Sequence, residues 1–120
     1  MHDKRSELKR SYKENPPLAG IFKITNKANG KIYIDKGLNV QGVLNRQEFQ
    51  LKNGSHKNEE LLLDWKKFGP ENFTFEVIDN LKPSDNPSFD INTELSDLES
   101  VWLNELSPYG EKGYNIPSRE

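Results

Sequence analysis

The sequence contains no cysteine, which excludes disulfides, thiolate metal sites and a cysteine nucleophile. Its two histidines, His2 and His56, are too few for a zinc centre built from several histidines. It also has no long apolar run, and its N-terminal residues are charged. Neither a membrane-spanning helix nor a secretory signal is therefore predicted, and we expect a soluble cytoplasmic protein.

The charge is unevenly distributed along the 120 residues, which are enough for one domain. Residues 1–67 contain 14 Lys/Arg and 8 Asp/Glu, a net charge of +6, whereas residues 68–120 contain 3 and 11, a net charge of −8. A basic first half can provide an electrostatic footprint for the phosphates of a nucleic acid. The alternative is that these charges belong to ordinary solvated helix faces.

The first half of the chain contains a predicted hairpin. Residues 1–17 are expected to be a helical extension, with its helix at 3–14. Hydrophobic and polar residues then alternate over 18–25 and 31–35, which indicates two strands. Between them, Asn29-Gly30 predicts a two-residue type I′ turn.

The remaining residues predict three helices and one further strand. The spacing indicates helices at 39–52, 58–68 and about 94–107, a strand at 73–79 and a mobile loop at 80–93. Asn39 is a plausible N-cap of the first of these helices. The order predicts an α+β fold in which a small three-stranded, mainly antiparallel sheet is flanked by helices, within a single domain spanning 18–120.

Five short segments, taken together and in order, resemble the GIY-YIG nuclease family. They are GIF at 20–22 for GIY, YID at 33–35 for YIG, KKFGPENF at 66–73, ESVW at 99–102 and GYN at 113–115. The likeness spans about residues 18–116. It implies the family's fold and a metal-assisted hydrolysis of DNA phosphodiesters. In that mechanism a glutamate holds one divalent ion, tyrosines help to activate water, and an arginine neutralises the phosphate.

Some positions of this sequence match the residues that the resemblance implies. Glu99 matches the metal-binding glutamate, and Tyr33, His56 and Asn115 match catalytic positions. Each also has a structural alternative: Glu99 as a rim residue paired with a lysine, Tyr33 as a packed ring with a wet hydroxyl, His56 as an exposed turn residue, and Asn115 as a turn residue bonded to its own backbone. A bound ion would be Mg²⁺ or Mn²⁺, if the site is active.

Four other positions depart from the family pattern. Phe22 lacks the hydroxyl of the first motif tyrosine, and Asp35 puts a negative charge where the family has glycine. Val43 stands where the arginine is expected, and Gln47 where a helix histidine is expected. Arg46, one helical turn after Val43, could supply the missing positive charge.

These matches and departures lead to three hypotheses. The first is an endonuclease-like protein with a degenerate, inactive or weakened site that retains some DNA binding. The second is an active, divalent-metal-dependent DNA endonuclease with an atypical site, and the third is a relic used for protein interaction. The predicted phosphate contacts are Lys23, Lys27, Lys31, Lys36 and Arg46.

Overall fold

The structure is a computed structural model, and it describes residues 17–117. The helix predicted at 3–14 lies outside the described residues. Three strands, β1 (Ala19–Asn26), β2 (Ile32–Gly37) and β3 (Phe73–Leu81), form one antiparallel sheet in the order β2-β1-β3. The sheet is flanked by three helices, which confirms the predicted α+β fold.

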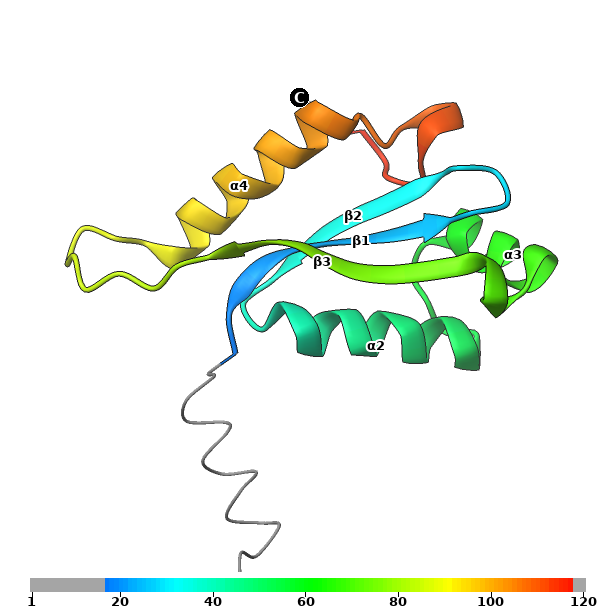
Figure 1. The fold of residues 1–120 in the computed structure, drawn as a ribbon, viewed down its shortest axis with the longest axis horizontal. Helices are drawn as coiled ribbons and strands as arrows, with labels where there is room; N and C mark the ends of the chain where they lie inside the picture. Colours follow the sequence, from blue (N-terminus) through cyan, green and yellow to red (C-terminus); the bar gives the residue numbers. More distant parts are fainter. Residues whose placement is uncertain (1–16, 118–120) are drawn as a thin grey trace, which may run out of the picture.

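The helices cover opposite faces of this sheet. Helices α2 (Val40–Asn53) and α3 (Glu59–Phe68) lie on one face, and α4 (Ile91–Leu106) crosses the other (Figure 1). Two short 3-10 helices, Pro70–Asn72 and Gly110–Lys112, precede β3 and follow α4. Within the described residues, no helix is long and apolar enough to cross a bilayer.

Each face of the sheet has its own hydrophobic core, because alternate residues of a strand point to opposite faces. The larger core, between the sheet and α2 and α3, includes Phe22, Ile24 and Tyr33. The smaller core, beneath α4, includes Ile21 and Ile34. Neighbours in the GIF and YID segments therefore belong to different cores.

The hairpin is confirmed, but its turn differs from the predicted type I′. The strands close at Asn26 and Lys31, where the Asn26 amide donates to the Lys31 carbonyl at 2.9 Å. Gly30 has a φ of 80°, whereas Asn29 does not adopt a positive φ, and the Gly30 amide donates to the Asn26 carbonyl at 2.7 Å. The loop is therefore four residues long, with glycine at its left-handed position.

Polar caps set the ends of the helices. The Asn39 side chain accepts the Gly42 amide at the start of α2, as predicted, and Gly54 closes the same helix with a φ of 80°. Asp90 caps α4 by accepting the Asn92 amide, so this helix begins at Ile91 rather than at residue 94. Strand β3 likewise continues to Leu81, two residues beyond its predicted end.

Candidate active site

The YID segment lies on β2, an edge strand of the sheet, and its residues face both sides. Tyr33 pairs with Ile24 and Asp35 with Phe22, on the face covered by α2 and α3. Ile34 belongs to the core beneath α4, and Lys36, two residues further, is on that same face. The candidate site is therefore divided between the two faces at the outer edge of β2.

Tyr33 is enclosed, with only 6 % of its surface exposed. Its ring lies edge-on to the His56 ring at 5.7 Å, and its hydroxyl donates to Asp35 Oδ2 at 3.4 Å. The pKa of Tyr33 is raised well above its usual range, first by burial, then by the charge and hydrogen bond of Asp35, and last by the charge of Glu99. The phenol is thus held in its protonated form.

His56 and Gln47 form a buried pair beside Tyr33. His56 is 4 % exposed, so the alternative of an exposed turn residue is wrong. Its Nε2 faces Gln47 Oε1, and its Nδ1 accepts the Asn58 amide at 3.0 Å. Burial lowers the pKa of His56, with Lys57 acting in the same direction and Asp35 against it. His56 is therefore a neutral imidazole whose two nitrogens are both engaged within the fold.

Val43, which stands at the arginine position, packs on the end of β2. A Cβ atom built on Gly37 would lie 2.6 Å from Val43 Cγ2, so the valine rests directly on the strand backbone. Its side chain is partly buried against the larger core. Arg46 is exposed on α2, and within residues 17–117 it makes no ion pair. At the position of the expected arginine, the described structure therefore has the uncharged side chain of Val43, while the positive charge of Arg46 lies in an exposed position on α2.

Glu99 is paired with a lysine, as its structural alternative predicted. Lys36 Nζ lies 2.8 Å from Glu99 Oε1, which joins β2 to α4, and the glutamate side chain is 18 % exposed. In the part of the chain that the structure describes, no group of three or more His, Asp or Glu could hold a metal ion. The residues at Glu99 therefore do not fit the divalent ion that the resemblance implies, because an ammonium group already neutralises this carboxylate.

Asn115 binds the backbone of β2 rather than its own turn. Its Oδ1 accepts the Ile34 amide at 2.9 Å, and its Nδ2 donates to the Ile34 carbonyl at 2.8 Å. The neighbouring Tyr114 amide donates to the Ile32 carbonyl at 2.8 Å. Both ends of the Asn115 amide are thus used to cover the outer edge of the YID strand.

Tyr114 anchors this C-terminal segment on the side of α3. Its hydroxyl donates to Asp64 Oδ2 at 2.7 Å and accepts from Asn26 Nδ2 at 3.0 Å. The pKa of Tyr114 is raised to about 12, chiefly by burial. Because this ring is fixed to the hairpin and to α3, the position of Asn115 on β2 is fixed as well.

The predicted phosphate contacts are partly neutralised by acidic neighbours. Lys23 pairs with Glu76 at 3.3 Å, and Lys31 with Glu60 at 2.5 Å, in addition to the Lys36 pair. Lys27 is exposed in the hairpin loop and, within residues 17–117, makes no ion pair, like Arg46.

Sequence reasoning missed Lys57, which follows His56 directly and precedes α3. Together with four other residues it lines a hollow of about 240 Å³: Tyr33, Asn58, Asn115 and Ile116. None of the ion pairs between described residues involves Lys57. The position of Lys57 directly after His56, a residue that matches a catalytic position of the family, is the feature of the sequence that could have identified it.

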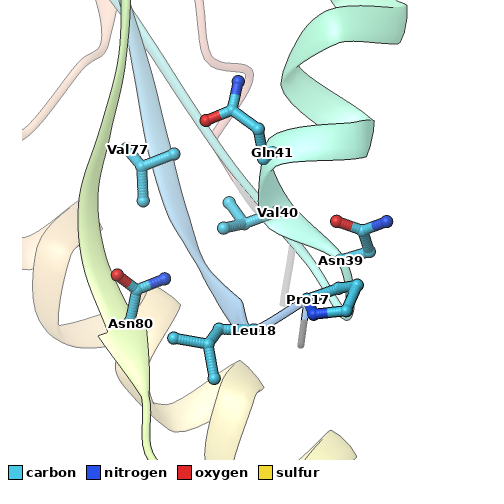
Figure 2. Close-up of a pocket in the computed structure, with 7 residues that line it drawn as sticks. All are labelled: Pro17, Leu18, Asn39, Val40, Gln41, Val77 and Asn80. Carbon is cyan, nitrogen blue, oxygen red and sulfur yellow. The ribbon is translucent and has the colours of Figure 1, made fainter. Parts of the chain in front are cut away.

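A second hollow, of about 290 Å³, lies at the start of α2 and is separate from the candidate site (Figure 2). Figure 2 shows side chains from the residues just before β1, from the start of α2 and from β3 around it. Its lining residues are Pro17, Leu18, Asn39, Val40, Gln41, Val77 and Asn80. None of the predicted site residues contributes to it.

Comparison with known proteins identifies the fold. No family model and no curated protein matches the sequence. Among solved structures, the chain is similar to the catalytic domain of the homing endonuclease I-TevI, a GIY-YIG endonuclease. The TM-score is 0.67 at 23 % identity, over 83 % of this chain and 99 % of that one.

A second structure gives the same result. It is the catalytic domain of the intron endonuclease I-TevI with one glutamate replaced by alanine, at a TM-score of 0.67 and 21 % identity. This match covers 86 % of this chain and 97 % of the other. The protein therefore has a GIY-YIG-like fold, as predicted.

Proposed function

We propose that this protein is a GIY-YIG-fold domain that binds DNA and has lost phosphodiester hydrolysis. The domain similar to it in structure is the catalytic domain of an endonuclease, which makes DNA the proposed partner. The departures from the motif make loss of catalysis the proposed outcome. The contacts of Tyr33 support the loss of hydrolysis, and the cations without ion pairs among the described residues support DNA binding.

The observation that carries the loss of hydrolysis is the contact between Tyr33 and Asp35. A tyrosine that helps to activate water must accept or pass on a proton. Here the hydroxyl donates to a carboxylate, and burial and two negative charges raise its pKa. Phe22 offers no second hydroxyl, and both nitrogens of His56 are occupied. Neither motif-tyrosine position therefore supplies a phenol that can itself accept a proton, since Tyr33 is held protonated and Phe22 has no hydroxyl.

The positive charge that the motif arginine would offer to a phosphorane is missing from its position as well. Val43 replaces the expected arginine, and the Lys36 ammonium is engaged by Glu99. Loss of one electrostatic stabiliser typically costs ~10²–10³ in rate, and loss of general acid–base help ~10²–10⁴. Losing both kinds of contribution leaves little of a nuclease.

DNA binding is supported by the positive charges that remain. Lys27, Arg46 and Lys57 make no ion pair within the described residues and lie on the hairpin loop, on α2 and before α3. Lys23 and Lys31 have acidic partners that are about half exposed. Exposed pairs of this kind contribute little, so a DNA phosphate can compete for these lysines.

The alternative function is a DNA endonuclease that requires Mg²⁺ or Mn²⁺. It is supported by one observation: Tyr33 lies on β2, Asn115 bonds to the Ile34 backbone of that strand, and Glu99 pairs with Lys36 of that strand. Supercoiled plasmid incubated with the protein and either ion distinguishes the two proposals. We expect no nicking above a Glu99→Ala control, whereas nicking that this substitution abolishes would establish the endonuclease.

DNA binding requires its own measurement. Fluorescence anisotropy with labelled duplex and single-stranded DNA should show an affinity that falls steeply as salt increases. Replacing Lys27, Arg46 and Lys57 by alanine should weaken binding and flatten this salt dependence. The control is Lys52→Ala, which removes a lysine of the same helix as Arg46 that is not among the predicted phosphate contacts. Absence of binding at low salt would leave the protein-interaction relic as the remaining hypothesis.

A further inference from the structure

Lys36 and Glu99 are brought together by the fold from positions 63 residues apart. Lys36 is fixed on β2, where it is paired with Ile21, and its amide donates to Asp35 Oδ1 at 2.8 Å. Glu99 is fixed on α4, between the apolar residues that pack beneath this helix. Their contact is therefore set by the packing of α4 on the sheet.

We propose that the Lys36 ammonium takes the place of a divalent cation at Glu99, so that this domain neutralises its own carboxylate and holds no metal ion there. The inference deepens the proposed function and rests on it, since both concern the same site. It assigns a definite role to Lys36, which the resemblance does not identify.

Comparison with a second lysine–glutamate pair, which lies within the sheet, shows that the pair of Lys36 and Glu99 is closer and better shielded from water. Lys23 and Glu76 are 3.3 Å apart, and the glutamate side chain is 52 % exposed. Lys36 and Glu99 are 2.8 Å apart, and that glutamate is 18 % exposed. The Glu99 carboxylate is thus better shielded from water, and in such surroundings a neighbouring charge acts more strongly.

A divalent ion and the ammonium cannot both occupy this position. Mg²⁺ is usually held by one or two carboxylates together with water, so a single glutamate would serve as its protein ligand only if no other cation occupied the carboxylate. Here an ion would have to break the contact between Lys36 and Glu99 and then lie close to a displaced positive charge. Both steps oppose binding, and both disappear when Lys36 loses its charge.

The test is Mn²⁺ binding, followed by the electron paramagnetic resonance signal of the free ion. Lys36→Met keeps most of the aliphatic stem and removes the charge. We expect it to bind Mn²⁺ at least about tenfold more tightly than the unmodified protein, which corresponds to ~1.4 kcal/mol. Lys36→Gln provides a second variant, and circular dichroism establishes that both are folded.

Two controls locate the effect. Lys23→Met removes the matched lysine and should leave Mn²⁺ binding unchanged. Adding Glu99→Gln to Lys36→Met should return the affinity to that of the unmodified protein. The inference is overturned if the Lys36 variants gain no affinity, if the gain survives Glu99→Gln, or if Lys23→Met produces the same gain. In the first case Lys36 only joins β2 to α4.

The inference about Lys36 and the proposed function can be overturned separately. Plasmid nicking by the unmodified protein would overturn the loss of hydrolysis, even if the unmodified protein bound no Mn²⁺ at Glu99. Conversely, tight binding of Mn²⁺ at Glu99 without nicking would overturn the role of Lys36 and leave the loss of hydrolysis in place.

Discussion

The motif positions on the two faces of the sheet differ in how deeply they are buried and in what they contact. Beneath α2 and α3, two of the four substituted positions are buried: Phe22 is fully buried in the core, and Gln47 is hydrogen-bonded to the buried His56. Beneath α4, Glu99 remains a polar, partly exposed residue that a single lysine neutralises. On the first face the substituted residues are held by packing and hydrogen bonds, whereas on the second a single ion pair engages Glu99.

This difference predicts how far each face is from activity. Restoring the motif residues on the α2 and α3 face requires substitutions in or beside the core, and these lower the stability of the fold. Freeing Glu99 on the α4 face requires only the substitution of Lys36.

The largest effect is expected from restoring both faces together. The variant combines Phe22→Tyr, Asp35→Gly, Val43→Arg and Gln47→His with Lys36→Met. We expect plasmid nicking in Mn²⁺ at least ~10² above that of the unmodified protein, because a proton acceptor and a positive charge return to the site. The measurement is the rate of conversion of supercoiled plasmid to open circles.

The same variant without Lys36→Met is the matched control. If the variant with only the other four substitutions nicks plasmid equally well, the Lys36 ammonium does not restrict activity at Glu99, and the two faces do not differ in the way described. A folded five-substitution variant that remains inert would mean that the motif positions have been assigned to the wrong residues.

A smaller effect is expected from matched truncations in the two cores. Leu61, on α3, is completely buried in the larger core, whereas Leu98, on α4, is only partly buried beneath it. Leu61→Ala should lower the free energy of unfolding by ~2–5 kcal/mol, because it opens a cavity that cannot collapse. Leu98→Ala should cost less, within the ~0.5–3 kcal/mol of most substitutions. Urea unfolding measures both, and equal losses would show that the cores are equally tight.

The smallest effect is a pH dependence confined to the α2 and α3 face. Burial lowers the pKa of His56 in the folded protein, so the unfolded chain takes up a proton more readily. Stability should be complete above about pH 6.5, the usual pKa of histidine, and should decrease as the pH falls from there to the folded pKa.

Urea unfolding at pH 7.5 and 5.5 measures this decrease. His56→Gln should lose less stability over the same range, and because the carboxylates are common to both proteins, the difference isolates His56. Identical profiles for the two proteins would show that His56 is not held in its neutral form.

Much of the fold could be predicted because it follows from local patterns. Alternation located the strands, and Asn39 marked the start of α2 as expected. The predicted turn type was wrong because the strands close at Asn26 and Lys31, before a four-residue loop. In the structure Asn26 bonds to the Tyr114 hydroxyl, 88 residues away, and the Lys27 amide donates to the Asn72 carbonyl, contacts that no two-residue pattern could indicate.

The candidate site was less predictable, because its chemistry depends on contacts between distant segments. The sequence indicated which residues could act, but not that Asp35 accepts the Tyr33 hydroxyl or that Gln47 meets His56. The pairing of Glu99 with a lysine was an open alternative, yet nothing in the spacing identified Lys36. The roles of Lys36 and Lys57 depend on the packing of α4 and α3, which only the tertiary structure specifies.

The contact between Asn115 and Ile34 has a further consequence for the molecule as a whole. An outermost strand presents unpaired amide and carbonyl groups on which another chain can add a strand, and this is a common route to aggregation. On β2, the Asn115 side chain occupies both backbone groups of Ile34, and Tyr114 occupies the Ile32 carbonyl. The GYN segment therefore competes with intermolecular strand pairing on β2, a structural use of this segment that does not depend on catalysis.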